Sequence, residues 1–300
     1  MFKNSLKFLS RLLDYLLLLF LIIIFLLASY MFLDEKMVYD VAKPENFVEY
    51  KPKENPLSFE ELKTKNDEVR AWLQIYGTSI DYPVVQAKDN VKYLNLDVFG
   101  NFSLAGSIFM DYRNDSSFKD FSTIIYGHHM AESAMFGDIS KYSEKEYFDK
   151  YRYGNLYIDG NNYGLEVFAF IPTSINKPSI SRPQKIDKNN NEKLLKEIKK
   201  NAAIYRDVDI KENDKILIFY TCSFKSQDDR DLLIVKVLQN TVDNKYQEKE
   251  KVKRTFNVES INNKNILVFL ILVLIILIIT YIILDRKQVN VGNRKAAIDE

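Results

Sequence analysis

Two long apolar runs frame this 300-residue chain and limit what it can fold into. They are Tyr15–Leu33 and Ile266–Leu284, each of 19 residues without a charged side chain. As a helix, each run would extend roughly 28 Å, close to the ~30 Å hydrocarbon thickness of a bilayer. Buried strands stop at about eight residues, so both runs predict membrane-spanning helices rather than elements of a soluble core.

The charges that flank the two runs predict their orientation. Basic residues lie outside both runs, at Lys3, Lys7 and Arg11 and again at Arg286, Lys287, Arg294 and Lys295. Because cytoplasmic flanks are enriched in Lys and Arg, residues 1–14 and 285–300 are predicted to be cytoplasmic tails, and the protein to cross the cell membrane twice with its middle outside. Against this orientation stand basic residues on the other side of the second run, Lys249, Lys251, Lys253, Arg254 and Lys264. A cleaved signal peptide is the alternative for the first run, but its apolar stretch exceeds the ~7–15 residues typical of one.

Three segments are predicted between the two runs. Residues 34–56 are polar and contain three spaced prolines, which is typical of an extracellular linker. Residues 57–240 carry the folding signals, beginning with a capping box at Ser58 and Glu61. Residues 241–265 are rich in Lys, Glu and Asn and are predicted to be a second linker to the apolar run 266–284.

The folded segment is predicted to be mainly β. Short runs rich in β-branched and aromatic residues, bounded by Gly, Asn, Asp or Pro, predict eight strands. They are 72–75, 82–86, 107–110, 123–126, 156–159, 165–170, 215–222 and 231–238. Strands this short and this close together predict one compact sheet or barrel. A long polar loop at 172–190 precedes an amphipathic helix that Asn191 can cap.

The chain holds one cysteine, Cys222, and two histidines, His128 and His129. A single cysteine cannot form an internal disulfide. Two consecutive histidines in an extended segment point apart and one thiol does not complete a zinc site, so no metal and no cofactor is predicted. The formal net charge of +1 and the lack of a basic stripe interleaved with aromatic residues predict no nucleic-acid partner.

Cys222 ends the apolar run 215–222, where a rigid strand would hold its thiol at the edge of a groove. Arg230 opens the next predicted strand, and pairing of the two strands would bring its guanidinium near the thiol, where it can stabilise an oxyanion. His128 follows Gly127 at the end of another strand, and an imidazole can generate or stabilise a thiolate. The residues alone leave three alternatives open: an inert buried cysteine, an idle loop histidine, and an arginine engaged in a surface ion pair.

The flanking motifs resemble those of the sortases, and most closely class B of these Gram-positive cysteine transpeptidases. The matching segments are Tyr-Gly-His-His-Met at 126–130, Met-Phe-Gly-Asp at 135–138, Thr-Cys-Ser-Phe at 221–224 and Asp-Asp-Arg at 228–230. Further matches are 59–62, 69–73, 80–86 and 106–111, so the resemblance covers roughly residues 57–240.

This resemblance implies an eight-stranded β-barrel with short helices, and a groove where three side chains converge. Cys222 would be the nucleophile, His128 the general acid/base and Arg230 the oxyanion-stabilising residue, with Thr173 and Thr221 as substrate contacts and His129 without a catalytic role. Such enzymes cleave the C-terminal sorting signal of a secreted protein through a thioester. They then transfer the product to an amine of peptidoglycan or of a pilin.

One feature departs from the class B pattern. Class B enzymes usually carry only the N-terminal anchor, whereas a second span is commoner in the pilus-assembling class C, whose Asp-Pro-aromatic lid is missing from residues 34–57. The acceptor amine therefore stays open. A catalytically inactive, membrane-tethered scaffold protein is the alternative function. A papain-like hydrolase is disfavoured because that family places its cysteine before its histidine.

Overall fold

The computed structural model describes residues 2–52, 57–130, 133–174, 180, 182–211, 213–222 and 229–247, together with 271, 272, 274, 275, 278, 279 and 281. Its contacts divide the chain into two units. The first comprises residues 1–37 with 257–300, and the second is the body formed by residues 38–256.

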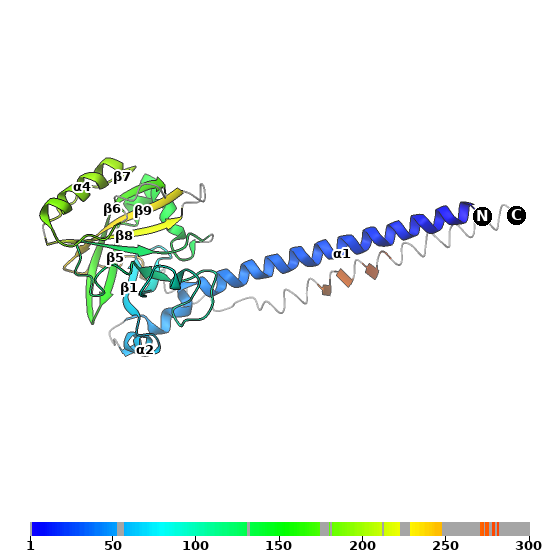
Figure 1. Ribbon diagram of the computed structural model, residues 1–300, viewed down its shortest axis with the longest axis horizontal. Coiled ribbons are helices and arrows are strands. Elements are labelled where there is room, and N and C mark those ends of the chain that lie inside the picture. Colours follow the sequence, from blue (N-terminus) through cyan, green and yellow to red (C-terminus); the bar gives the residue numbers. More distant parts are fainter. Residues whose placement is uncertain are drawn as a thin grey trace. The chain divides into compact units, whose positions relative to one another are not determined.

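The first unit contains most of helix α1 (Phe2–Ala42), the long blue helix of Figure 1. Within the described residues, Leu12–Met31 is the one helical segment long and apolar enough to cross a membrane. The described positions of the second apolar run are helical, and the Tyr281 ring meets the Tyr15 ring edge-on at 6.4 Å. The rest of that run lies outside the described residues, so the two-span topology stays a prediction.

Residues 38–50 differ from the linker predicted at 34–56. Helix α1 continues to Ala42, and the 3-10 helix η1 (Pro44–Tyr50) follows at once. Pro44 occupies the first turn of η1, where its missing N–H costs nothing, so it begins a helix instead of marking an extended stalk. Phe47 and Tyr50 are buried in the main core, and the Tyr82 hydroxyl donates to the Ala42 carbonyl at 3.0 Å.

The body is built on a single sheet. Its strands are β1 (Val69–Ile75), β2 (Asp81–Val85), β3 (Ile108–Met110), β4 (Ser122–Tyr126), β5 (Tyr153–Ile158), β6 (Asn161–Ser174), β7 (Ile204–Tyr205), β8 (Lys215–Cys222) and β9 (Asp229–Leu238). The order is β5-β1-β2-β3-β4-β8-β9-β6-β7, and β5 also pairs with β6. That pairing closes eight strands into a barrel and leaves the short β7 on the edge of β6. The predicted eight-stranded barrel is confirmed.

Strand β8, which ends at Cys222, is buried on both of its faces. Its side chains alternate between two cores: Leu217 and Phe219 belong to the main core, and Ile216 and Ile218 to a second core. The second core also includes Leu194 and Ile198 of α4 (Lys188–Asn201), which covers the outside of the barrel in Figure 1. A strand buried on both faces reads as a continuous apolar run, and it is held rigidly along its length.

The helix ends correct two details of the predicted pattern. Asp187, not Asn191, caps α4, since its carboxylate accepts from the Asn190 N–H at 2.9 Å, whereas Asn191 is buried in the first turn. Helix α2 (Leu57–Lys65) already contains Ser58, whose hydroxyl donates to the Lys51 carbonyl at 3.1 Å. Other short helices within the described residues are η2 (Lys92–Leu94), η4 (Gly137–Ser143) and α3 (Lys145–Lys150).

The start of the second predicted linker is docked on the body. The Tyr246 hydroxyl donates to the Lys150 carbonyl at 2.9 Å, and its ring lies 5.5 Å from the Tyr151 ring. The Gly164 N–H donates to the Asn240 carbonyl at 3.2 Å. The body therefore extends at least to this point of the chain, and residues 248–265 lie outside the described part.

Candidate active site

Four strand ends meet at one edge of the barrel. Strand β8 lies between β4 and β9, and β6 follows β9. The parallel register of β4 and β8 sets Tyr126 beside Tyr220, and the Gly127 N–H donates to the Tyr220 carbonyl at 3.2 Å. Each of these tyrosines is two residues before a predicted site residue, His128 on one strand and Cys222 on the other. The register therefore places the backbones of His128 and Cys222 at the same height along the two neighbouring strands.

The imidazole of His128 is held by a loop of the body. Its Nε2 lies 2.9 Å from the Leu94 carbonyl oxygen, at the end of η2. Because a carbonyl oxygen only accepts, this contact puts a hydrogen on Nε2 and leaves Nδ1 as the nitrogen that can take a proton. The ring is half-buried, so it remains accessible at the barrel edge.

The segment that follows His128 folds back against it. His129 pairs with Met135 in an isolated bridge, and the Phe136 N–H donates to the His128 carbonyl at 3.0 Å. Burial lowers the pKa of His129 below its ordinary value of 6.5. Gly127 has no positive φ, and a Cβ there would meet Ile108 Cδ1 at 2.5 Å. Glycine is therefore required at this position for lack of space and not for a positive φ.

Arg230 lies opposite Cys222 in the antiparallel register of β8 and β9. On the other side of β9, the same Arg230 lies opposite Thr173 of β6. Directly opposite residues project from the same face of a sheet, so these three positions form a row across β8, β9 and β6. The Arg230 guanidinium donates to the Asp229 carbonyl at 2.8 Å. The side chain of Cys222 lies outside the described atoms, and its backbone defines its place in the row.

The two predicted substrate contacts occupy different faces. Thr173 is partly exposed and stands in the row with Arg230. Thr221 is 2 % exposed and alternates with Cys222 along β8, so it points with Phe219 toward the barrel interior. Its hydroxyl has no hydrogen-bond partner within the described part of the chain. Thr221 is therefore placed beneath the row and not in it.

The sequence motifs missed two features of the site. The Leu94 contact is made by a backbone carbonyl, which no side-chain motif reveals. The Tyr126 and Tyr220 rings pack edge-on at 5.3 Å just below the row. An aromatic residue two positions before both His128 and Cys222 was the available signal, because residues i and i+2 of a strand share a face.

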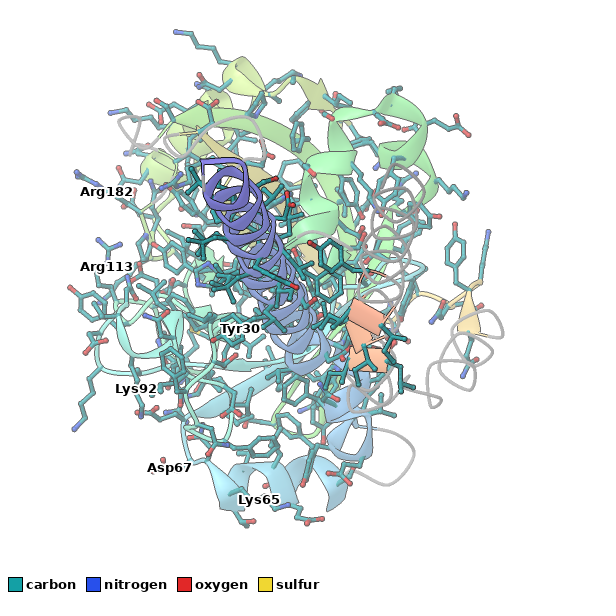
Figure 2. All side chains as sticks on the ribbon, turned by 90° about the vertical axis from the view of Figure 1, so that its right-hand side faces the viewer. Tyr30, Lys65, Asp67, Lys92, Arg113 and Arg182 are labelled. Carbon is teal, nitrogen blue, oxygen red and sulfur yellow. The ribbon has the colours of Figure 1, made fainter. Side chains whose placement is uncertain are left out.

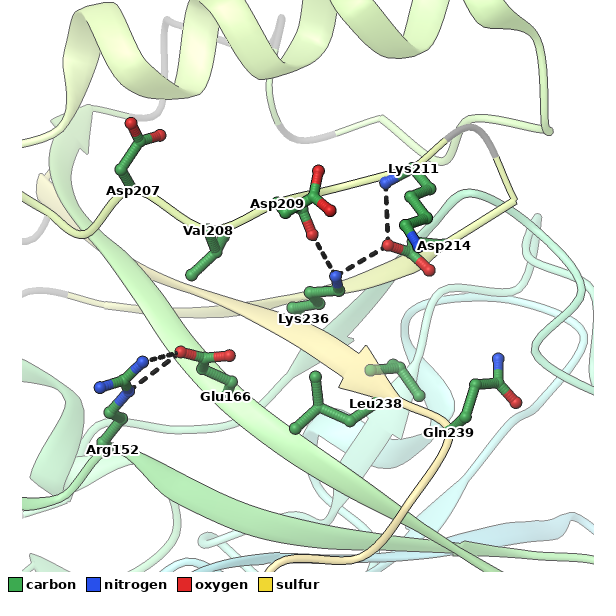
Figure 3. Close-up of a pocket in the computed structure, with 11 residues that line it drawn as sticks. Arg152, Glu166, Asp207, Val208, Asp209, Lys211, Asp214, Lys236, Leu238 and Gln239 are labelled. Carbon is green, nitrogen blue, oxygen red and sulfur yellow. Dashed lines mark hydrogen bonds and ion pairs between the residues drawn. The ribbon is translucent and has the colours of Figure 1, made fainter.

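The cavity of Figure 3 lies away from the row, at the other end of β6 and β9, and has a volume of about 460 Å³. Four of its charged side chains pair within the protein: Lys236 with Asp214 at 2.8 Å, and Arg152 with Glu166. The Lys236 ammonium also donates to the Asp209 carbonyl. Among the described residues, no group of three or more His, Cys, Asp or Glu side chains could hold a metal ion.

Known proteins are similar to this chain in sequence and in fold. No protein-family model matches the chain. Sortase B of Staphylococcus aureus is 31% identical over 186 residues, which cover 60% of this chain and 75% of that protein. Sortase B of Listeria monocytogenes is 32% identical over 178 residues, covering 59% and 71%.

Solved structures agree. Sortase B from the type II pilus of Streptococcus pneumoniae superposes with a TM-score of 0.54 at 35% identity, covering 61% of this chain and 99% of that one. A Streptococcus pyogenes class B sortase involved in pilus biogenesis gives 0.55 at 32% identity, covering 60% and 97%. A sortase B complexed with triglycine gives 0.56 at 30% identity, covering 61% and 86%.

The chain folds into a closed eight-stranded barrel with a cysteine at the end of the inner strand β8, and sortases match it over most of their own length. Together these findings define a cysteine transpeptidase that acts on sorting signals. The chain belongs to the sortase family, class B.

Proposed function

We propose that this protein is a membrane-anchored transpeptidase in which Cys222 is the nucleophile, His128 the general acid/base and Arg230 the oxyanion-stabilising residue. The observation that carries the proposal is the register, which pairs Cys222 with Arg230 while the parallel pairing of β4 and β8 leads to His128 at the same level. A nucleophile and its proton acceptor on two rigid strand ends have the placement that covalent catalysis requires.

Acylation begins when Nδ1 of His128 takes the thiol proton of Cys222, while Nε2 stays bonded to the Leu94 carbonyl. The sulfur attacks the threonine carbonyl carbon of the sorting signal, and the carbonyl oxygen gains negative charge beside Arg230. The scissile C–N bond then breaks, and His128 returns the proton to the departing amine. The product is a thioester between the substrate and Cys222.

Deacylation runs through the same groups in the opposite sense. A primary amine attacks the thioester carbon and gives its proton to His128, the C–S bond breaks, and an amide forms. The outer side chains of β9 and β6, with Thr173 beside Arg230, flank the path of the incoming substrate. His129, which burial keeps in its neutral form at neutral pH, takes no part.

The apolar segments of the chain support the proposed membrane anchoring, and the similar structures support the proposed amine acceptors. The helical segment Leu12–Met31 would hold the enzyme in the membrane with residues 38–256 outside, and the run 266–284 would be a second span. Two pilus-related class B sortases are among the similar structures, and another similar structure is complexed with triglycine. A pilin amine and a glycine amine of the cell wall are therefore the two acceptors proposed.

The test uses the full-length protein in detergent micelles with a library of threonine-containing C-terminal peptides. Wild type should form a peptide thioester, seen as a mass adduct on Cys222, and Cys222→Ala should form none. Adding triglycine or a lysine peptide should convert the adduct into the corresponding amide, and the faster of the two identifies the acceptor. Cleavage that persists in Cys222→Ala would rule out the assigned nucleophile.

The alternative is an inactive scaffold of the surface-protein assembly machinery. It predicts a wild-type protein that forms no thioester with any member of the library, and a thiol that resists alkylation by iodoacetamide. A simple protease with the same dyad would give hydrolysis even with abundant triglycine present. The three functions therefore give three different product patterns in one assay.

A further inference from the structure

The motif Gly106–Asp111 ends in a carboxylate whose burial calls for an explanation. The side chain of Asp111 has no exposed surface, yet it accepts five hydrogen bonds. The donors are the Arg113 N–H at 2.9 Å, its Nε at 2.8 Å and its Nη2 at 2.7 Å, Asn90 Nδ2 at 3.0 Å and the Tyr126 hydroxyl at 2.9 Å. A buried carboxylate is tolerated only when its charge is compensated in this way.

One of these bonds leads to His128 through strand β4. The Tyr126 hydroxyl is fixed by Asp111, and its ring is packed between Phe109 at 5.2 Å and Tyr220 at 5.3 Å. Tyr126 therefore connects β3, β4 and β8 two residues before His128 on one strand and level with Tyr220, two residues before Cys222, on the other. A shift of this ring would change the spacing of β4 and β8 at their ends.

A second bond leads to His128 through the loop before η2. Asn90 donates to Asp111 and accepts from the Tyr112 N–H at 3.0 Å, which ties this loop to the end of β3. The next residues form η2, whose last residue, Leu94, supplies the carbonyl that lies 2.9 Å from His128 Nε2. The loop that orients the imidazole is thus held by the same carboxylate.

We propose that Asp111 is a positioning residue of this enzyme, which fixes His128 against Cys222 from two sides, through Tyr126 and through the Asn90–Leu94 loop. The inference rests on the proposed roles of His128 and Cys222. Asp111 itself touches no reacting atom. Its contribution is to hold the general acid/base in a reactive geometry, where displacements of about 1 Å can cost about a hundredfold in rate.

The charge of Asp111 is balanced from outside the barrel. Arg113 extends to the surface, where Figure 2 labels it, and 44% of its side chain is exposed. Burial acts to raise the pKa of Asp111, but the bonds from Arg113, Asn90 and Tyr126 outweigh it and hold the pKa below the ordinary 3.8. The group is therefore a carboxylate at neutral pH and can accept from all its donors at once. An asparagine would turn an NH₂ group toward them.

The experiment compares Asp111→Asn, Tyr126→Phe and Asn90→Ala in the full-length protein in detergent. Asp81→Asn is the matched control, because Asp81 is also buried, accepts from Trp72 Nε1 at 2.8 Å and pairs with Lys51 at 2.6 Å, on strand β2. Two quantities are measured well below each variant's melting temperature. One is the kcat and KM for the library peptide that wild type cleaves fastest, and the other is the pH profile of Cys222 alkylation by iodoacetamide.

Asp111→Asn should lower kcat by about ten- to a hundredfold with little change in KM, because binding is kept and geometry is lost. Its alkylation profile should move toward that of His128→Ala. Tyr126→Phe and Asn90→Ala should each reproduce part of the effect. Asp81→Asn should lose stability but keep the wild-type kcat and profile.

The proposal is overturned if Asp111→Asn keeps kcat within about twofold of wild type, or if Asp81→Asn loses as much kcat as Asp111→Asn, which would mark a general loss of stability. If wild type forms no thioester, the proposed function fails and the alkylation profile alone decides. In that case the positioning role is supported if wild type and His128→Ala have different alkylation profiles and Asp111→Asn has the profile of His128→Ala. The same profile in all three proteins ends it.

Discussion

Cys222, the last residue of β8, lies directly opposite Arg230 of β9, in an antiparallel register that continues without a shift from Lys215. Residues so paired have their Cβ atoms about 5 Å apart on one face of the sheet. From this distance the planar Arg230 guanidinium can reach the carbonyl oxygen of a substrate that Cys222 attacks. The pairing of two strands, and not a loop, sets the distance.

Arg230→Lys should therefore remove most of the activity while leaving the fold intact. Lysine keeps the charge, but it loses the fork of donors whose directions are fixed. We expect the rate of thioester formation to fall by about a hundredfold, as for loss of an oxyanion donor. Stopped-flow mass spectrometry of the peptide adduct would measure it.

Arg206→Lys is the matched control for this change. Arg206 is mostly buried, donates to the Val167 carbonyl and pairs with Asp149 at 2.9 Å, on the outside of the barrel. It should lower the melting temperature and leave thioester formation unchanged. Equal losses of activity in both variants would mean that Arg230 is structural.

The neighbouring histidines should separate by function. His128→Ala should abolish turnover, since no other imidazole takes the thiol proton, whereas His129→Gln should retain it. The contrast is read from kcat at a fixed peptide concentration. Loss of turnover in both variants would show that the segment, and not His128 itself, is required.

His129 should instead appear in the pH dependence of stability. Burial lowers its pKa below 6.5, so the unfolded chain binds a proton that the folded chain does not. The stability that this difference represents is complete above pH 6.5 and is lost as the pH falls below it. His129→Gln should flatten that part of the curve. Urea unfolding between about pH 5 and pH 8 would measure it, with His128→Ala as the reference.

The sequence predicted the barrel well because its strands carry their own signals. The run 215–222 is apolar throughout, which matches a strand buried on both faces, and Arg230 was expected near Cys222 if the two strands paired. The pairing is observed. The catalytic roles of these residues stay predictions.

The features that the sequence did not predict depend on contacts between distant parts of the chain. Phe47 and Tyr50 lie in a proline-containing polar segment, and only their packing against Phe99 and Tyr82 makes that segment part of the core. The resemblance implied Thr221 as a substrate contact beside Cys222, but adjacent strand residues face opposite ways, and only the sheet shows that Thr221 lies beneath the row. The Leu94 carbonyl has no side-chain signature at all.

The docked start of the second linker leads to a graded prediction. Tyr246→Phe removes the hydrogen bond to the Lys150 carbonyl and should cost about 1 kcal/mol, whereas Tyr246→Ala also removes the ring packed on Tyr151 and should cost more. Neither variant should alter thioester formation, because Tyr246 lies near Leu238 and Glu166, at the end of β9 and β6 opposite the row. Thermal unfolding of the two proteins measures the difference. Equal stability of both variants and wild type would mean that the segment is not held in solution.

Gly127 offers a test of how closely β4 must approach its neighbours. A methyl group at this position would lie 2.5 Å from Ile108 Cδ1 and 2.7 Å from the Phe136 ring, so Gly127→Ala forces both to move. Overpacking of this kind costs about 1–3 kcal/mol. Because Gly127 directly precedes His128, the same movement should displace the imidazole, and kcat should fall further than stability alone explains.

A second substitution can relieve part of this clash. Ile108→Val deletes the Cδ1 atom that the new methyl group would meet, while the valine alone should cost about 1 kcal/mol through the lost methyl group. In the double variant, Gly127→Ala with Ile108→Val, we expect both melting temperature and kcat to recover partly relative to Gly127→Ala. The two single variants and the double variant form a thermodynamic cycle, and strictly additive effects would exclude the steric explanation. Recovery of stability without recovery of kcat would show that the Phe136 contact, and not Ile108, controls the position of His128.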